Sequence, residues 1–385
     1  MRTVVRAAQL LTAQRAIEDP FVVVEDGAVT EIGQADAASL PNGEVLDFPG
    51  ATILPALFDV HIHGSAGHDI MEATPQALAT IGGFLARHGV GAYLATTVSA
   101  DMDMTLRSLE GLALEMRRPQ LGAQPVGIHL EGPFLSPHKR GAHPERLLQK
   151  PSVKLLNQMW QAAEGQVRLL TIAPELPGAD ETIARAVELG IRVSLGHSNA
   201  TLAEARKGVQ LGAASATHTF NAMRTFDHRE PGLVGEVLTN DGLFAELICD
   251  GLHVEPTAVR IYWKMKGRER GILITDAMSA AGMPDGPYKL GELDVRVEGG
   301  VCLIEENTLA GSTLTLDTGL RNFAAFTGAA LAEVMPLATR NPARMLGLDD
   351  KIGDIAAGRS ADFVILSPER TVIQTFLRGA PQIAA

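Results

Sequence analysis

Short apolar runs alternate with longer amphipathic segments through most of the chain. The apolar runs have the length of buried strands and are too short for ordinary helices. We expect eight such strands, at residues 52–58, 92–97, 125–130, 167–172, 192–195, 213–217, 244–249 and 271–275. Segments with helical periodicity separate most of them, at residues 75–88, 106–116, 179–189 and 202–211. This alternation favours a (β/α)8 barrel, whose chemistry lies at the carboxyl ends of the strands. The alternative is an open, doubly wound sheet, which would bind ligands at one switch point.

The two ends of the chain follow a different pattern. Residues 21–24 and 28–33 are strand-like runs on either side of Asp26-Gly27, which is a hairpin signal. Residues 361–366 and 371–377 are also strand-like. We therefore expect both ends to build one small β-sandwich domain, from residues 1–50 and 346–385, beside a barrel domain of residues 51–345.

Polar residues suited to catalysis follow the apolar runs. A single histidine or aspartate in such a place is usually a structural polar residue or a helix cap, and Asp276 alone would fit that role. A barrel, however, brings all its carboxyl strand ends to one mouth. The set at successive strand ends therefore predicts a metal-dependent hydrolase site: His61 and His63, Glu131, His197, His218 and Asp276.

The histidine pair after the first run strengthens the metal prediction. On a strand, residues i and i+2 point to the same face, so His61 and His63 would project side by side. Neutral imidazole suits Zn, Fe and Ni, and two such rings make half of a transition-metal site. His129 shares a strand face with Glu131 and either supports a ligand or, as we prefer, fills the barrel. We interpret the remaining histidines outside the loop at 136–144 as structural or solvated: His68, His88 and His228.

Composition narrows the class of protein. With 385 residues, 46% hydrophobic and 20% charged, the chain is typical of a globular protein with a large core. The formal net charge of −12 argues against a nucleic-acid partner, which requires basic surface. We expect no transmembrane span or signal peptide, and two unpaired thiols, Cys249 and Cys302, in the cytoplasm. No phosphate-binding glycine loop of the nucleotide-binding type is present.

The ordered motifs from about residue 50 onward resemble the amidohydrolase superfamily. Within it, the chain resembles the N-acetylglucosamine-6-phosphate deacetylase family. The resemblance implies a TIM-type barrel with a small β domain, and a metal-dependent deacetylase. The matching segments are residues 61–64, 130–134, 139–143, 196–200, 217–223, 229–232, 250–253, 275–277, 309–312, 341–343 and 353–362.

The resemblance also implies a role for each matching residue. Glu131, His197 and His218 would be the main metal ligands, and His61 and His63 would help to hold a second ion. The metal would be Zn²⁺ or Fe²⁺, with one ion expected and a second possible. Around the sugar phosphate the resemblance implies a further set, part of which a neighbouring subunit of a homodimer would supply: Asn221, Ala222, Arg229, His253 and Leu309.

The chemistry follows from these implied roles. An amide is a poor electrophile and water a poor nucleophile, and a divalent ion improves both. Asp276 would take a proton from the water that the metal activates, so that hydroxide attacks the carbonyl, and return the proton to the leaving amine. His143 would polarise the acetyl carbonyl and hold the oxyanion. The products would be acetate and D-glucosamine 6-phosphate.

Three other functions compete with this one. A related deacetylase could prefer another N-acetylhexosamine phosphate, such as the galacto epimer. Cyclic-amide hydrolases of the same superfamily typically carry a carboxylated lysine after the fourth strand, whereas the run at 167–172 ends without one. A metal-binding scaffold without turnover is a non-enzymatic alternative, and the presence of Asp276 and His143 argues against it.

Overall fold

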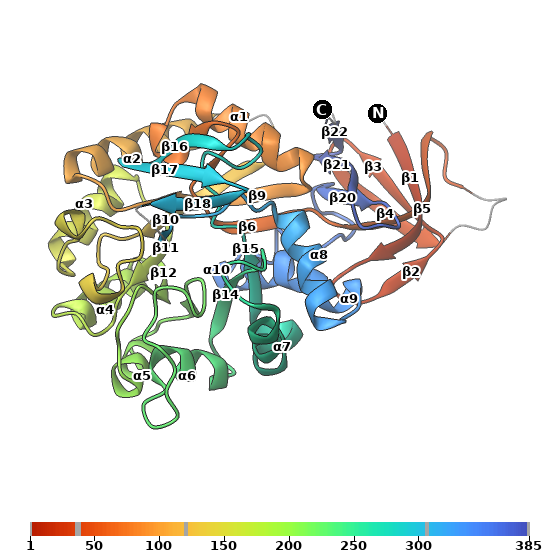
Figure 1. Cartoon of the computed structure of the whole chain (residues 1–385). Coiled ribbons are helices and arrows are strands. Elements are labelled where there is room, and N and C mark those ends of the chain that lie inside the picture. The colour runs from red at the N-terminus through yellow and green to blue at the C-terminus, as the bar shows by residue number, and fades with distance from the viewer. Residues whose placement is uncertain (1, 35–39, 119–121, 305–307, 383–385) are drawn as a thin grey trace.

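The computed structural model describes residues 2–34, 40–118, 122–304 and 308–382 (Figure 1). Eight parallel strands form one sheet in the order β15-β14-β13-β12-β11-β10-β9-β6, so that strands consecutive in this set are neighbours in space. This arrangement confirms the (β/α)8 barrel. Its strands are β6 (Leu57–Ile62), β9 (Val90–Thr97), β10 (Gln124–Glu131), β11 (Val167–Ile172), β12 (Arg192–Leu195), β13 (Ser215–Ala216), β14 (Phe244–Ile248) and β15 (Gly271–Ile274).

The barrel closes where the carboxyl ends of its first and last strands meet. The Asp276 N–H donates to the His61 carbonyl at 2.9 Å, and the His63 N–H donates to the Ala277 carbonyl at 2.8 Å. Deeper in the same seam, the Thr275 hydroxyl donates to the Asp59 carboxylate at 2.6 Å. Burial raises the pKa of Asp59 to about 6, although the bonds from Thr275 and His61 lower it. Closure therefore places the histidine pair of β6 directly beside Asp276.

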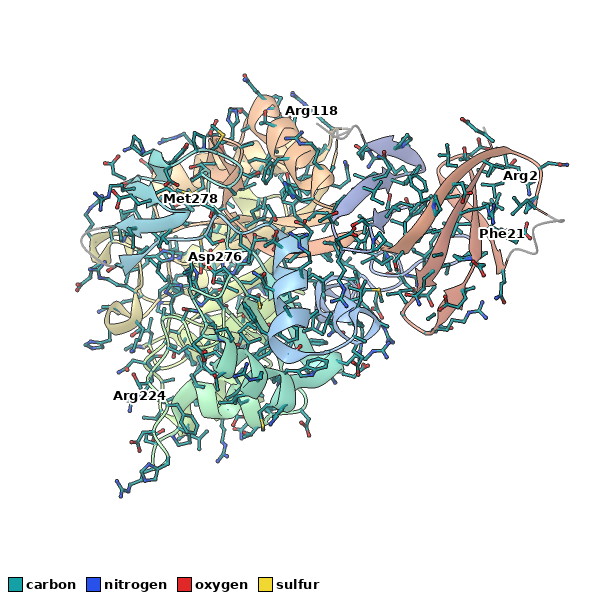
Figure 2. All side chains as sticks on the ribbon, turned by 45° about the vertical axis from the view of Figure 1, so that its right-hand side comes forward. Arg2, Phe21, Arg118, Arg224, Asp276 and Met278 are labelled. Atoms are coloured by element: carbon teal, nitrogen blue, oxygen red, sulfur yellow. The ribbon has the colours of Figure 1, made fainter. Side chains whose placement is uncertain are left out.

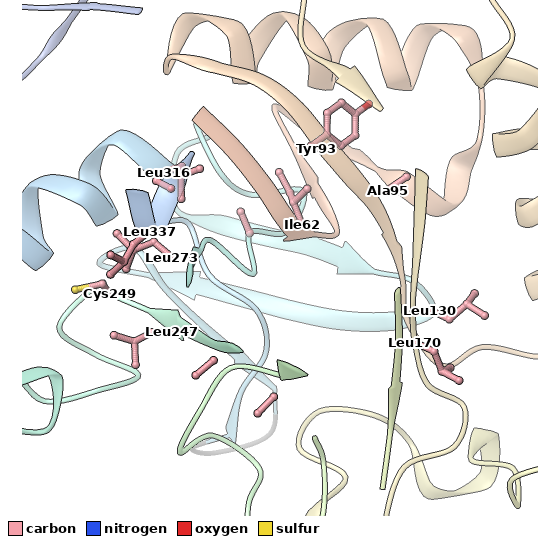
Figure 3. Close-up of a cluster of buried hydrophobic side chains, with 14 of the residues drawn as sticks. Ile62, Tyr93, Ala95, Leu130, Leu170, Leu247, Cys249, Leu273, Leu316 and Leu337 are labelled. Atoms are coloured by element: carbon pink, nitrogen blue, oxygen red, sulfur yellow. The ribbon is translucent and has the colours of Figure 1, made fainter. Parts of the chain in front are cut away.

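Each barrel strand is followed by at least one helix. Side chains such as Thr74, which caps the N-terminus of α1, fix where the helices begin. The buried apolar faces of the helices pack on the outward side chains of the strands, including Tyr93, Leu130 and Leu170 (Figure 3). The four predicted helical segments are confirmed within four residues at either end. The helices are α1 (Pro75–Arg87), α2 (Met102–Met116), α3 (Val153–Ala162), α4 (Ala179–Glu188), α5 (Leu202–Gln210), α6 (Gly232–Thr239), α7 (Pro256–Arg270), α8 (Leu316–Thr327), α9 (Leu331–Val334) and α10 (Arg340–Leu346), with short 3-10 turns η1 (Ile70–Glu72), η2 (Pro137–Lys139), η3 (Glu145–Leu147) and η4 (Met335–Ala338).

A second sheet is built from both ends of the chain, as expected. The predicted hairpin is present, and Ala361 N–H donates to the Gly27 carbonyl at 2.9 Å where the sheet curls back on itself. Its core of Val5, Val22, Ile53 and Phe363 lies inside the curl. Its strands are β1 (Arg2–Leu11), β2 (Ala16–Glu18), β3 (Pro20–Glu25), β4 (Ala28–Gln34), β5 (Glu44–Pro55), β20 (Phe363–Leu366), β21 (Val372–Leu377) and β22 (Ala380–Gln382).

The strand predicted at residues 52–58 is wrong in one respect. Residues 52–55 belong to β5, which pairs antiparallel with β20 in the sheet of the chain ends, and the first barrel strand begins at Leu57. The apolar run is continuous because both parts are buried, so hydrophobicity carries no sign of the change of sheet. β5 crosses the domain boundary that we set between residues 50 and 51. The division into domains at 1–50, 51–345 and 346–385 stays a proposal, and residues 1, 35–39 and 383–385 of the small domain lie outside the described residues.

A third, antiparallel sheet lies between β15 and α8, and we did not predict it from the sequence. Its buried face packs on Met71, Val98 and Met278 beside the barrel mouth. Leu290 and Leu309 extend from it into the cavity described below. The strands are β16 (Gly286–Leu290), β17 (Leu293–Glu298), β18 (Val301–Ile304) and β19 (Thr308–Leu309), and a separate small ribbon pairs β7 (Gly64–Ser65) with β8 (His68–Asp69).

None of the helices in the described ranges combines the length and the apolar character that a membrane crossing requires.

Candidate metal centre

The structure brings the six strand-end residues together in one buried cluster. Glu131 is the last residue of β10, and the other five lie at or just beyond the carboxyl ends of β6, β12, β13 and β15. Five of the six residues are at most 4% exposed, and Asp276 is at the rim with 9%. Figure 2 shows Asp276 inside the barrel part of the molecule. The convergence predicted from strand order is therefore present: His61, His63, Glu131, His197, His218 and Asp276.

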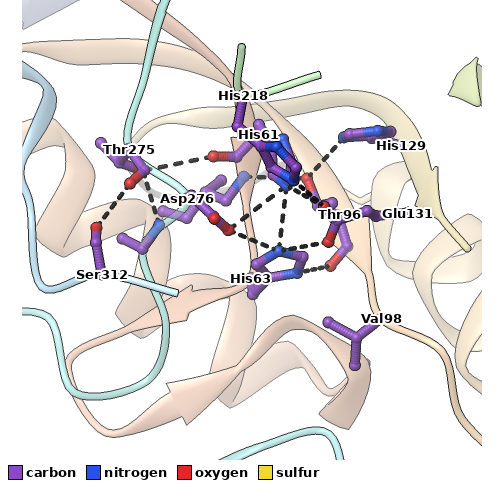
Figure 4. A network of polar contacts seen from close by, with 12 residues as sticks. His61, His63, Thr96, Val98, His129, Glu131, His218, Thr275, Asp276 and Ser312 are labelled. Carbon is purple, nitrogen blue, oxygen red and sulfur yellow. Dashed lines mark hydrogen bonds and ion pairs between the residues drawn. The ribbon is translucent and has the colours of Figure 1, made fainter. Parts of the chain in front are cut away.

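Glu131 lies between two halves of this cluster. On one side, its Oε1 atom is 3.1 Å from Nε2 of both His197 and His218, whose Nε2 atoms are 2.9 Å apart. On the other side, its Oε2 atom is 3.2 Å from Nε2 of His63. That nitrogen is also 3.0 Å from Asp276 Oδ1 and 3.3 Å from Nε2 of His61 (Figure 4). One carboxylate thus joins two sets of ligand atoms.

The outer nitrogens of the rings show which atoms face the centre. Nδ1 of His197 is 3.0 Å from the Lys139 carbonyl, and Nδ1 of His63 is 3.3 Å from the Thr96 carbonyl. Nδ1 of His61 is 3.1 Å from a Glu246 carboxylate oxygen. A carbonyl or carboxylate oxygen only accepts, so each Nδ1 carries the hydrogen and each Nε2 directs its lone pair inward in the neutral ring. Outer hydrogen bonds of this kind orient metal-ligating histidines.

These converging lone pairs and carboxylates fit a divalent metal ion. The ligand atoms of His61, His63, Glu131 and Asp276 lie within 4.8 Å of one another, and a second such group consists of Glu131, His143 and His197. Imidazole nitrogen with carboxylate oxygen is a ligand set that divalent transition metals prefer.

The electrostatics of the cluster agree with a cation at its centre. Burial alone would raise the pKa of Glu131, but the charge of His61 and a hydrogen bond from the His143 ring hold it well below its usual range. Burial is likewise outweighed at Asp276, where His61 and His63 lower the pKa to about 2. The same two carboxylates raise the pKa of His63 to about 9, against the effect of burial. The carboxylates thus stay ionised near neutral pH, and their charge attracts a proton or a metal ion to the space between them.

His143 also lies near Glu131, but its hydrogen bonds give it a different role. The Ser99 N–H donates to Nδ1 of His143 at 3.2 Å, so this nitrogen accepts and the ring hydrogen is on Nε2. That Nε2 faces the cluster, 3.5 Å from Glu131 Oε2. His143 is therefore a hydrogen-bond donor directed into the site, whereas the rings of His61, His63 and His197 present lone pairs.

A cavity of about 170 Å³ opens onto the cluster. His253 lines it and is held by Asp250, whose Oδ2 is 2.6 Å from Nδ1 of the ring. Burial would lower the pKa of His253, but this hydrogen bond and the Asp250 charge raise it, which favours the protonated form of the ring. The lining residues are His63, Val98, Glu131, Gly141, Ala142, His143, His197, His218, Asn221, Ala222, His253, Asp276, Leu290, Leu309 and Gly311.

Arg229 is the predicted substrate-binding residue that does not line this cavity. It lies in the exposed segment of residues 225–229, where Phe226 is 55% exposed. This segment follows Arg224, which Figure 2 labels at the lower left of the molecule. The arginine side chain therefore faces solvent in this single chain.

Our interpretation of the remaining histidines agrees with where the structure places them. His68 pairs with Glu72. His88, at the end of α1, pairs with Asp317 of α8, and His228 lies on an exposed loop. His129 fills the barrel below the cluster and stands edge-on to the His61 ring, with 4.6 Å between centroids.

Two buried residues of the site were missed from the sequence. Glu246 contacts His61 from below, and Ser99 fixes the ring of His143. A signal for Glu246 existed, because it is a charged residue in the middle of the apolar run at 244–249. Ser99 acts partly through its backbone N–H, which residue type does not reveal.

Comparison with known proteins agrees with the fold and the cluster. Residues 52–381 match the model of the amidohydrolase family. The chain is 38% identical over 379 residues to N-acetylgalactosamine-6-phosphate deacetylase of Escherichia coli O157:H7, covering 98% of this chain and 99% of that protein. It is 35% identical over 374 residues to N-acetylglucosamine-6-phosphate deacetylase of Bacillus subtilis, covering 96% and 94%.

Among solved structures, the chain superposes on a mutant of N-acetyl-D-glucosamine-6-phosphate deacetylase from Mycobacterium smegmatis in complex with N-acetyl-D-glucosamine-6-phosphate. The TM-score is 0.94 at 34% identity, and 99% of each chain is covered. The fold and the cluster define a barrel hydrolase with a divalent metal site. The chain belongs to the amidohydrolase family.

Because Glu131 belongs to both halves of the cluster, we expect Glu131→Gln to weaken metal binding at both of them. The loss of affinity should exceed the roughly 10- to 100-fold that removal of an outer partner of a ligand causes. Metal per chain is measured by mass spectrometry after dialysis, with Glu188→Gln on the exposed side of α4 as the control. Wild-type metal content in folded Glu131→Gln would contradict the assignment.

Proposed function

We propose that this chain hydrolyses the acetamide of N-acetyl-D-glucosamine 6-phosphate to D-glucosamine 6-phosphate and acetate. The observation that carries the proposal is the buried cluster around Glu131, which opens onto a cavity with Asp276 and His143 at its wall. The family match and relatives that share more than a third of their residues with this chain support it. The enzyme is a deacetylase of the amidohydrolase family.

Asp276 and His143 have separate roles in the proposed reaction. A bound divalent ion supplies Lewis acidity, which lowers the pKa of a water to about 7 and polarises a carbonyl. Asp276, with a pKa of about 2, is ionised at neutral pH and accepts the proton of the attacking water. It then returns the proton to the departing amine nitrogen. His143 donates its Nε2 hydrogen to the carbonyl oxygen as negative charge develops there.

We assign the metal as Zn²⁺ or Fe²⁺, held first by Glu131, His197 and His218. A second ion would lie among His61, His63 and Asp276, with Glu131 shared. Mixed nitrogen and oxygen ligands agree with either metal.

The cavity wall supports binding of a phosphorylated amino sugar. His253, whose pKa Asp250 raises, is suited to an anionic group, and Asn221, the Ala222 backbone and Leu309 lie on the same wall. The cyclic-amide alternative is weaker, because β11 ends at Ile172 without the lysine that those enzymes typically carry there. In this chain Glu131, at the end of β10, supplies the carboxylate instead.

We propose a homodimer in which Arg229 reaches the cavity of the neighbouring subunit. Its exposure outside the cavity of its own chain supports this, as does the exposed Phe226 beside it. A guanidinium there would bind the phosphate through two parallel hydrogen bonds.

We also propose a cytoplasmic location, supported by Cys249 and Cys302, which are both free and buried.

The direct test is acetate release from N-acetylglucosamine 6-phosphate, its unphosphorylated form and the galacto epimer, with bound metal quantified. We expect the highest kcat/KM for the phosphorylated gluco sugar. Loss of the phosphate should lower it at least about tenfold, because one hydrogen bond to a charged group contributes about 1.5–3 kcal/mol. No release from this substrate by metal-loaded protein would overturn the proposal, and a clear preference for the galacto epimer would change the substrate.

Asp276→Asn should keep the ion at Glu131, His197 and His218 but lose most turnover. An amide cannot accept the proton of water, and acid–base catalysis contributes about 100- to 10,000-fold. Turnover and metal content are measured together, with Asp180→Asn on the surface of α4 as the control. Near-normal kcat in Asp276→Asn would refute the acid–base role.

Arg229→Ala should raise KM for the phosphorylated sugar by roughly tenfold or more and change kcat little, since Arg229 is proposed to bind and not to react. Arg107→Ala, on the exposed face of α2, is the control. Sedimentation of the wild-type chain should give a dimer. An unchanged KM would argue against the phosphate role, and a monomeric active enzyme would exclude the shared site.

A further inference from the structure

Glu246 is a carboxylate in the middle of an otherwise apolar barrel strand. It is the third residue of β14 and is 0% exposed. Its neighbours in β14 are apolar, and a valine or leucine is the more usual residue at such a buried position. A buried carboxylate is unfavourable unless strong partners compensate it. Its partners therefore show why it is tolerated.

The side-chain hydrogen bonds of this carboxylate go to the metal centre. Oε2 accepts from Nδ1 of His61 at 3.1 Å and from the backbone N–H of His218 at 3.4 Å. Oε1 has no hydrogen-bond partner within the described residues. Glu246 does not line the cavity, so it does not touch substrate. It contacts one residue from each half of the cluster around Glu131, from the side opposite the cavity.

The bond to His61 differs from the corresponding bonds of the other rings. His63 and His197 each place Nδ1 against a neutral backbone carbonyl, whereas Nδ1 of His61 faces a carboxylate. Hydrogen bonds with a charged partner are roughly twice as strong as neutral ones. Such a partner fixes the ring and raises the basicity of the opposite nitrogen. That nitrogen, Nε2 of His61, is 3.3 Å from Glu131 and 3.5 Å from Asp276.

We propose that Glu246 is a positioning residue that sets the cation affinity of the His61–His63 half of the centre, and with it whether a second ion is bound. The proposal rests on the metal centre assigned above and deepens it. Glu246 acts through His61: it holds Nδ1–H, directs Nε2 inward, and adds negative charge on the far side of the ring. The half formed by Glu131, His197 and His218 depends on it much less, because there its carboxylate accepts from a backbone N–H and not from a ring.

The test measures metal binding in the absence of substrate. Zn²⁺ uptake by wild type, Glu246→Gln and Glu246→Leu is followed by equilibrium dialysis and by release into a colorimetric chelator. Glutamine keeps an oxygen that can accept from Nδ1 but removes the charge, whereas leucine removes both. We expect two ions in wild type, and a loss of affinity for one of them of about 10- to 100-fold in Glu246→Gln and more in Glu246→Leu. The other ion should be retained.

A matched control separates this role from a general effect of burial. Glu236→Gln changes a buried carboxylate on α6 that pairs with Arg206 and Asn240, away from the centre, and should leave both ions in place. In a His61→Asn background, Glu246→Gln should have no further effect on uptake, because the residue acts through that ring. If Glu246→Gln does not fold, Glu246→Asp is measured, and it should weaken the same ion because its oxygen is withdrawn from Nδ1.

Equal uptake and release by wild type and folded Glu246→Gln would overturn the inference, as would equal loss of both ions. An additional loss in the His61→Asn background would show that Glu246 does not act through His61. These outcomes do not depend on deacetylation, so the proposed function and this inference can fail separately.

Discussion

The site depends on the closure of the barrel between its first and last strands. The backbone bond from Asp276 to His61 and the bond between Thr275 and Asp59 join β15 to β6 at their carboxyl ends. Without this seam, the histidine pair and the proposed acid–base would belong to opposite edges of a sheet. With it, they lie 3.0 to 3.5 Å apart and face Glu131 from across the mouth. The geometry of catalysis is thus set by the same hydrogen bonds that complete the fold.

Closure concentrates charge in a place that would otherwise be apolar. Glu131, Glu246 and Asp276 are all buried, and a buried carboxylate requires compensation. The imidazole rings compensate part of this negative charge. A cation bound between the rings and the carboxylates would compensate the rest. This arrangement links metal binding to stability, because an ion that binds only the folded chain stabilises it. It also explains why polar residues interrupt the barrel at one end, while apolar side chains such as Phe58 and Ile272 fill the other.

The convergence of Glu131 and Asp276 could be predicted from sequence, because an apolar run of strand length fixes where the next polar residue emerges. Other features depend on contacts that a single sequence does not contain. The run at 52–58 serves two sheets without a break in hydrophobicity. The partner of Glu246 follows only from how β14 faces β6 across the barrel. The place of Arg229 depends on loop conformation. The strand β17, in contrast, does carry a signal in its sequence, because apolar and polar residues alternate along it.

Glu131 and the surrounding histidines are proposed to hold the catalytic ion. Anomalous diffraction at the absorption edge of the bound metal, from crystals of active enzyme, tests it most directly. We expect the strongest peak within about 2.0–2.2 Å of Glu131 and of Nε2 of His197 and His218. A strongest peak elsewhere in the molecule, or none at this cluster in protein that releases acetate, would contradict it.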